Sequence, residues 1–186
     1  MAPRIKIEKE MIISAAIECV RQEGAQSLTE RNIAGRLGCS IQPIFRVFNN
    51  METLKLEVIK RASDILSESM YRDSAGFSDT GLAYIRFAKE EKELFKLLYM
   101  SDFRNKLSFV NAIDNEDDKT AILQLAASVG LDYESAKQLY LEMWIYTHGI
   151  ASMLATDAYQ FSDAEIEALL TGAYTAFLNN KKYKGI

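Results

Sequence analysis

The chain has 186 residues, and its 48% of hydrophobic and 26% of charged residues are typical of a globular protein, which excludes bulk disorder. Its 22 basic and 26 acidic residues give a formal net charge of −4, which excludes a protein that coats nucleic acid with its whole surface but allows a local basic patch. Two prolines and nine glycines leave long helices uninterrupted and disfavour a sheet-rich fold with many tight turns.

Apolar residues recur at helical spacing along most of the chain and predict an all-α fold of about nine helices without strands. In chain order, the expected helical segments are 4–23, 29–37, 41–48, 51–70, 82–88, 92–100, 102–111, 114–129, 132–156 and 162–180. Gly24 and Gly130 directly follow two of these segments, and 162–165 is a capping box. The polar stretch 74–81 contains two glycines and is expected to be a loop. The acidic run 114–118 lacks the glycine and spaced oxygen ligands of a calcium loop, so we interpret it as the solvated start of a helix.

Other classes of site are excluded by residue types. The two cysteines, Cys19 and Cys39, cannot form a disulfide scaffold and match no metal motif, and the single histidine, His148, excludes a site that needs two imidazoles. There is no signal-peptide core, and no run approaches the roughly 20 apolar residues of a membrane helix. Phosphate loops, dinucleotide-binding turns and nucleophile elbows are absent from the sequence. We therefore expect a cytoplasmic, non-enzymatic protein with no metal ion, no cofactor and no membrane partner.

Residues 28–48, LTERNIAGRLGCSIQPIFRVF, have the pattern of a helix-turn-helix. The residues expected to face inward are Ile33, Ala34 and Leu37 on the first helix and Ile44, Val47 and Phe48 on the second. The three residues 38–40 form the turn. An ordinary helical hairpin inside a core has the same pattern.

The second helix of this pattern presents Ser40, Ile41, Gln42, Phe45 and Arg46 outward, and the major groove of DNA can admit such a helix. Ser40 can cap the helix, Ile41 can touch a thymine methyl group, and Gln42 can pair with adenine. Arg46 can bind phosphate or guanine. Pro43 is tolerated because its missing N–H lies in the first turn.

The distribution of charge agrees with DNA binding by the N-terminal third. Residues 1–60 contain nine Lys and Arg against seven Asp and Glu, a net charge of +2, whereas the remainder contains thirteen against nineteen, a net charge of −6. This excess is modest, and salt-bridged surface helices can also produce it.

From 12 to 59 the chain resembles the TetR (tetracycline-repressor-like, AcrR-type) family of transcriptional regulators. The residues that carry this resemblance are Ala15-Ala16, Glu23-Gly24, Leu28-Thr29, Ile33-Ala34, Leu37-Gly38, Ser40, Ile44, Phe48, Glu52 and Leu54. A second resemblance, to the regulatory domain of the branch called WHG, rests on Trp144, His148-Gly149, Phe87-Ala88 and Glu93-Leu94-Phe95.

The resemblance implies a homodimer that binds a near-palindromic double-stranded DNA operator. Each subunit would have a helix-turn-helix head, 1–50, and a helical effector-binding and dimerisation domain, 51–186, whose connecting helix is 51–70. The function implied is that of a repressor, released from DNA when a small lipophilic or aromatic effector binds the C-terminal domain. The candidate DNA-binding residues are Thr29, Arg36, Ser40, Ile41, Gln42, Pro43, Phe45, Arg46 and Asn50.

The sequence departs from the family at three positions that commonly help to hold phosphate. The family usually has a tyrosine where this chain has Phe45, a histidine at Val47 and a lysine at Met51. An alternative function is therefore a helical ligand-binding or protein-interaction module with weak or lost DNA binding.

Aromatic and sulfur-containing residues are dense between 84 and 153, as in a pocket for a flat or lipophilic ligand or in a plain core. The candidate effector-binding residues are Phe87, Leu98, Tyr99, Phe103, Leu107, Met143, Trp144, Thr147 and His148. His148 can hydrogen-bond an effector or report pH, and it can equally be a satisfied buried histidine.

The last two long helices are the candidates for the dimer contact, because apolar residues cover more than one side of the final helix. The candidate interface residues are Ile150, Leu154, Leu170, Tyr174 and Phe177. The alternative is that these residues pack internally and that no dimer forms.

Overall fold

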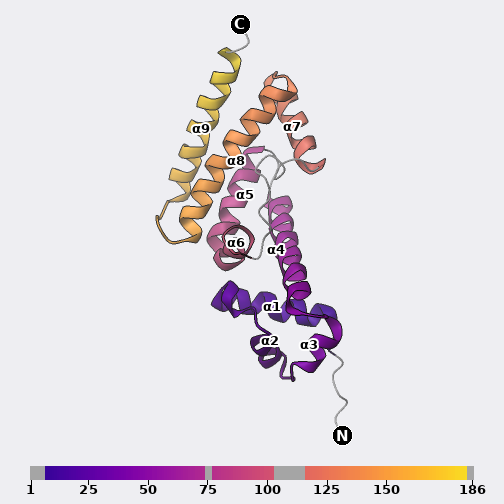
Figure 1. Ribbon diagram of the computed structural model, residues 1–186. Coiled ribbons are helices and arrows are strands. Elements are labelled where there is room, and N and C mark those ends of the chain that lie inside the picture. The colour runs from indigo at the N-terminus through magenta and orange to yellow at the C-terminus, as the bar shows by residue number, and fades with distance from the viewer. Residues whose placement is uncertain (1–6, 74–76, 103–115, 184–186) are drawn as a thin grey trace. The chain divides into compact units, whose positions relative to one another are not determined.

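The computed structural model describes residues 7–73, 77–102 and 116–183 (Figure 1). The described residues form helices without strands, which confirms the predicted all-α fold. The α-helices are α1 (Lys9–Glu23), α2 (Glu30–Leu37), α3 (Gln42–Val47), α4 (Met51–Asp73), α5 (Phe77–Glu90), α6 (Lys92–Tyr99), α7 (Glu116–Val129), α8 (Tyr133–Ala155) and α9 (Asp163–Tyr183). A single 3-10 turn, Ala25–Ser27, follows α1.

The chain divides into two compact units. One comprises Met1–Glu68 with Glu90–Arg104, and the other comprises Ser69–Lys89 with Asn105–Ile186. The first unit therefore combines the helix-turn-helix with most of α4 and with α6. The functional boundary between 1–50 and 51–186 stays a prediction.

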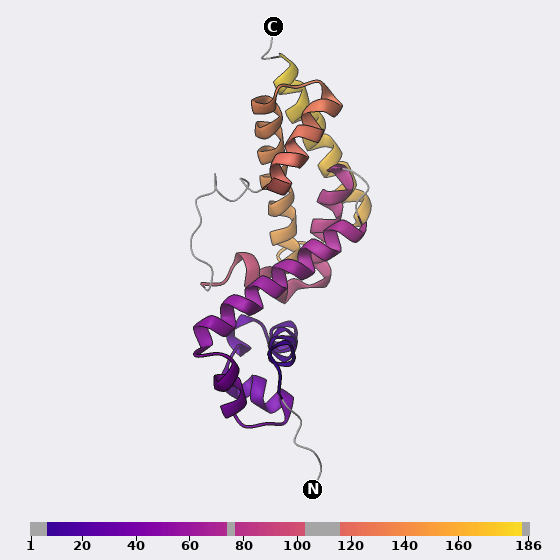
Figure 2. The same cartoon turned by 90° about the vertical axis from the view of Figure 1, so that its right-hand side faces the viewer.

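The core of the first unit is built on α1, whose fully buried residues Ile12, Ala16 and Val20 recur every four positions along one face. Helices α2 and α6 both pack against α1. Figure 2 shows α1, α2 and α3 together at the indigo end of the ribbon, followed by α4 as one continuous helix. Leu54 and Val58 supply the buried face of α4.

In the second unit, α8 packs against both α7 and α9. Local signals begin these helices where the sequence predicts them. The side chain of Asp132 accepts a hydrogen bond from the N–H of Ser135 at 3.0 Å and caps α8. The capping box at the start of α9 is confirmed, because the Ser162 N–H donates to the Glu165 carboxylate at 2.8 Å and the Glu165 N–H donates to the Ser162 hydroxyl at 3.3 Å.

Several helix boundaries in the structure differ from the predicted ones. The first helix begins at Lys9 rather than at residue 4, because Glu8 is extended, with φ −106° and ψ 164°. The predicted loop 74–81 is helical from Phe77 onward. Gly81 lies in this helix, where a Cβ atom would be in ordinary van der Waals contact with the hydroxyl oxygen of Thr147, at 3.8 Å. The connecting helix continues to Asp73 rather than to residue 70. In the helix that begins at Phe77, tertiary packing outweighs the roughly 1 kcal/mol that a glycine such as Gly81 costs.

The described part of the acidic run begins a helix as predicted, since α7 starts with Glu116, Asp117 and Asp118, whereas residues 114 and 115 lie outside the described residues. The helix predicted over 102–111 lies, apart from Asp102, outside the described residues. None of the helices in the described ranges is both long and apolar enough to cross a membrane.

Candidate functional site

The turn between α2 and α3 is defined by a glycine in the left-handed conformation. Gly38 has φ 62° and ψ 33°, and its N–H bonds back to the carbonyl of Gly35 at 3.2 Å. The N–H of Cys39 bonds to the carbonyl of Ala34 at 3.0 Å. These bonds end α2 and redirect the chain into α3, as the helix-turn-helix pattern requires.

Helix α3 is held to the core by Ile44, which is fully buried, and by Phe48, which is 3% exposed. Its opposite side is exposed. The prediction that Ser40, Ile41, Gln42, Phe45 and Arg46 face outward is confirmed, since all five are exposed. Pro43 is half-buried and lies within the first two residues of the helix.

Two local predictions for α3 were wrong. Val47 was expected to face the core but is 37% exposed, because Ile44 and the C-cap residue Phe48, four positions apart, form the buried face and Val47 lies at its edge. Ser40 was expected to cap the helix. The cap position is instead occupied by Ile41, and no side chain caps the N-terminus of α3.

The two other candidate polar residues of this region begin helices. The Thr29 hydroxyl accepts a hydrogen bond from the N–H of Asn32 at 3.3 Å and caps α2. The side-chain amide oxygen of Asn50, Oδ1, accepts hydrogen bonds from the N–H of Thr53 at 2.8 Å and from its hydroxyl at 3.1 Å. Thr29 and Asn50 therefore lie at the positive ends of the dipoles of α2 and α4.

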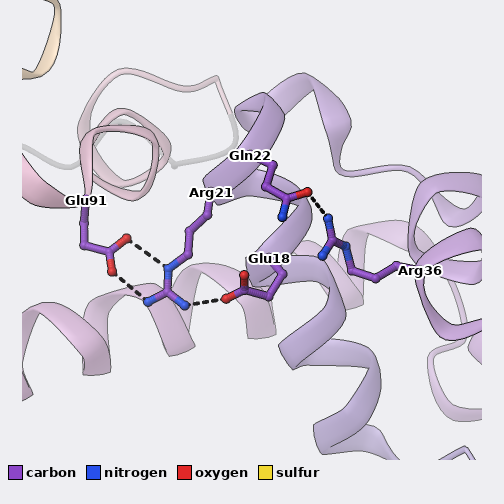
Figure 3. Close-up of polar contacts among 5 residues, drawn as sticks. All are labelled: Glu18, Arg21, Gln22, Arg36 and Glu91. Carbon is purple, nitrogen blue, oxygen red and sulfur yellow. Dashed lines mark hydrogen bonds and ion pairs between the residues drawn. The ribbon is translucent and has the colours of Figure 1, made fainter.

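The candidate Arg36, at the end of α2, donates a hydrogen bond to the side chain of Gln22 in α1 (Figure 3). The neighbouring Arg21 binds both oxygens of Glu91, with Nε–Oε2 at 2.9 Å and Nη2–Oε1 at 2.8 Å. Its Nη1 also donates to Glu18 at 2.5 Å. The hydrogen bonds to Glu91 are the largest cause of a raised pKa of Arg21, and those to Glu18 add to it against partial burial.

Candidate effector-binding residues gather around His148 in the second unit. The imidazole stacks on the indole of Trp144, with ring centroids 5.1 Å apart and planes 3° apart. Its Nδ1 lies 2.8 Å from the hydroxyl oxygen of Tyr84 on α5. Burial lowers the pKa of His148, which favours the neutral imidazole. Thr147, beside it in the chain, is 7% exposed.

The remaining effector candidates are distributed over both compact units. Phe87 and Met143 are buried in the second unit, whereas Leu98 and Tyr99 belong to the first. Phe103 and Leu107 lie outside the described residues.

Sequence reasoning missed Tyr84 as a partner of His148. A tyrosine on an amphipathic helix within the aromatic-rich region was a weak signal for it. Arg21 and Glu91 were also missed, and no local pattern in the sequence joins them.

The candidate dimer residues differ in burial. Ile150, Leu154 and Leu170 are 5%, 6% and 9% exposed and are thus packed within their own chain. Tyr174 and Phe177 are half-buried, and Phe177 meets the ring of Tyr146 edge-on. The exposed large apolar residues of α8 and α9 are Ile145 at 53%, Met153 at 41% and Leu169 at 36%.

The sequence model for the tetracyclin repressor-like C-terminal domain matches residues 77–177, which is more than half of the chain. The chain belongs to the TetR family. The matched region of this TetR-family chain begins at the first residue of α5 and ends within α9. The finer resemblance to the WHG branch stays a prediction.

Solved structures share the fold of this TetR-family chain. A TetR family transcription regulator from Marinobacter aquaeolei VT8 is 17% identical, with a TM-score of 0.63 over 90% of this chain and 94% of that one. A variant of TetR from Acinetobacter baumannii AYE, in complex with minocycline, is 18% identical, with a TM-score of 0.60 over 96% of this chain and 98% of that one. A protein of unknown function from Rhodococcus sp. RHA1 is 17% identical, with a TM-score of 0.65 over 97% and 98%. Comparison with curated proteins finds no significant match.

Proposed function

We propose that the chain is a ligand-responsive, DNA-binding transcriptional repressor that leaves its operator when a small lipophilic or aromatic effector binds the C-terminal domain. The observation that carries this proposal is the short helix α3 of a TetR-family chain. Buried Ile44 and Phe48 hold this helix, while Gln42 and Arg46 are exposed on its outer side. Such a helix fits a major groove of B-DNA.

The proposed DNA contacts divide into base-reading and phosphate-binding groups. Gln42 lies in the first turn of α3 and Ile41 occupies the cap position at its N-terminus, where side chains reach base edges. Thr29 and Asn50 begin α2 and α4, and backbone N–H groups at such helix starts favour a phosphate. Arg36 and Arg46 add positive charge. In this proposal, these groups bind phosphate in place of the tyrosine, histidine and lysine that the family usually has at the positions of Phe45, Val47 and Met51.

The effector site is proposed around Trp144, His148 and Thr147. A flat indole stacked on a neutral imidazole provides an aromatic surface, and the hydroxyl of Thr147 provides one polar anchor. The variant of A. baumannii TetR in complex with minocycline is an example of a ligand bound by a protein of this fold.

The homodimer is proposed to form through α8 and α9, as the sequence predicts. Because Ile150, Leu154 and Leu170 are packed within their own chain, the surface they offer to a partner is small. Ile145, Met153 and Leu169 are the exposed apolar residues of the two helices and provide the contact area instead, next to the half-buried Tyr174 and Phe177. Cytoplasmic location and a near-palindromic operator stay predictions.

The test is retention of genomic DNA fragments by the purified protein, followed by fluorescence anisotropy on the retained site at several salt concentrations. Gln42→Ala is expected to relax base preference at one position, with a loss of about 1–3 kcal/mol for the preferred base. If Arg46 binds phosphate, Arg46→Ala weakens the binding of all DNA sequences alike and lowers the salt dependence of that binding. Arg61→Ala, which removes a surface ion pair on α4, serves as the control. Retention of no fragment at low salt would refute the proposal.

One observation favours the second candidate function, a protein-interaction module. Phe45 and Val47 on α3 are 41% and 37% exposed, and the cap residue Ile41 is 41% exposed, so the surface around α3 is partly apolar. If the chain retains no DNA, the substitution Phe45→Ser is expected to weaken binding to a protein partner.

A further inference from the structure

A single residue separates α5 from α6, and it lies beside the boundary between the two compact units. Helix α5 ends at Glu90, α6 begins at Lys92, and Glu91 stands between them. The second unit includes α5 up to Lys89, and the first unit resumes at Glu90. The backbone of Glu91, with φ −115° and ψ 49°, is not helical. The helix is thus interrupted within a few residues of the point where the chain passes from one unit to the other.

Ion pairs hold this junction on each side. Lys89, in the last turn of α5, lies 3.0 Å from Asp163 at the start of α9, and both belong to the second unit. Glu91 is bound in the first unit by the guanidinium of Arg21, which is in the last turn of α1. The pair with Arg21 has two parallel N–H···O bonds, so it specifies an orientation as well as a distance.

The contact continues from Arg21 into the helix-turn-helix. Gln22, the next residue of α1, accepts a hydrogen bond from Arg36 in the last turn of α2 (Figure 3). Two consecutive residues of α1 therefore connect the α5–α6 junction with the end of α2. Directly after Arg36 and Leu37, Gly38 begins the turn into α3.

Helix α6 also packs against the end of α1. The carboxylate of Glu93 would lie 2.8 Å from a Cβ atom added to Gly24, the residue that ends α1. Leu94 and Leu97 of α6 are fully buried. Helix α6 is thus packed against α1, near its end. A displacement of the junction would therefore disturb packed side chains and not only groups that face solvent.

We propose that Arg21 is a positioning residue that couples the α5–α6 junction to the helix-turn-helix, so that a change in α5 reaches α2 and α3 through the Arg21–Glu91 pair and the end of α1. Helix α4 is a separate covalent connection between the units. The use of this coupling in operator release rests on the proposed function, whereas the coupling itself does not.

The expected strength of the coupling is modest. The side chains of Arg21 and Glu91 are 33% and 28% exposed, so water and salt screen their charges in part. We therefore expect an effect of roughly fivefold, at the low end of the range for coupled sites, which falls as salt is added.

The test is amide hydrogen exchange of the full chain without DNA. Helix α5 is perturbed by Tyr84→Phe, which removes the hydroxyl beside His148, and separately by Ala83→Val, which adds carbon at a site only 1% exposed. Each change is made in the wild-type chain, in Arg21→Met and in Lys9→Met. Lys9→Met is the matched control because Lys9 is also on α1 and pairs with Glu57 of α4 at 2.7 Å.

The expected result is a roughly fivefold change of exchange in residues 30–47 when α5 is altered in the wild-type and Lys9→Met chains. In the Arg21→Met chain, the same α5 changes are expected to alter this exchange less than twofold. The proposal is overturned if the α5 changes do not alter exchange in residues 30–47 of the wild-type chain. It is also overturned if they alter this exchange equally in the Arg21→Met chain. Since the readout needs no DNA, failure of the proposed DNA binding would be seen separately in the retention assay.

Discussion

Lys181 of α9 and Glu142 of α8 form an ion pair whose two partners differ in burial. The Nζ atom lies 2.7 Å from Oε1 of Glu142, and the side chains are 5% and 30% exposed respectively. The second carboxylate oxygen of Glu142 is buried and has no hydrogen-bond partner within the described part of the chain. Removing the carboxylate would leave a deeply buried ammonium group, whereas removing the ammonium would leave a carboxylate on a side chain that is 30% exposed, whose buried second oxygen has no partner in either case. We therefore expect the two substitutions to be unequal.

Glu142→Gln is expected to lower the free energy of unfolding by about 2–3 kcal/mol. The loss of one partner of a fully buried pair costs about 3–5 kcal/mol, and the partial exposure of Glu142 reduces this cost. At about 2–4 °C per kcal/mol for a chain of this size, the melting temperature falls by roughly 4–12 °C. Lys181→Met keeps the length of the buried stem and is expected to change stability by less than about 1 kcal/mol.

The assay is urea unfolding followed by the fluorescence of Trp144, the single tryptophan of the chain, which lies two residues from Glu142 on α8. The double variant Glu142→Gln, Lys181→Met is expected to be more stable than Glu142→Gln alone, because it no longer buries an uncompensated charge. If Lys181→Met costs more than Glu142→Gln, the reasoning from burial is refuted.

Three further predictions follow from local geometry. Thr29→Ala should lower the free energy of unfolding by about 1 kcal/mol in urea titrations, because the cap of α2 is lost, whereas Thr29→Asp keeps the cap; equal losses would contradict the capping role. Gly38→Ala should cost about 1 kcal/mol in the same assay, because its φ of 62° disfavours a side chain although the space there is open; an unchanged midpoint would contradict this. Burial lowers the folded pKa of His148, so the unfolded chain binds more protons as the pH falls through the unfolded pKa of about 6.5. Its contribution to stability is therefore retained above that pH and lost below it, and melting curves of His148→Gln should show a weaker decline on acidification.

The sequence indicated most of the local structure of the chain because the signals involved act within a few residues. The side chain of Asp132, the Ser162–Glu165 box and Gly38 each satisfy or redirect backbone groups at most a few positions away. The exposed side of α3 was predictable for the same reason, since helical spacing alone separates Ile44 from Gln42 and Arg46. The family was predicted from such short patterns in their order along the chain.

Only the tertiary structure decided which distant side chains meet and which helical positions are covered. Arg21 pairs with a carboxylate 70 residues away, and Tyr84 meets His148 across 64 residues. Packing also placed Gly81 inside a helix and left Val47 exposed, against the local pattern. The helix propensity of a residue other than proline is worth about 1 kcal/mol or less at one site, so the contacts supplied by the rest of the fold determine the outcome there.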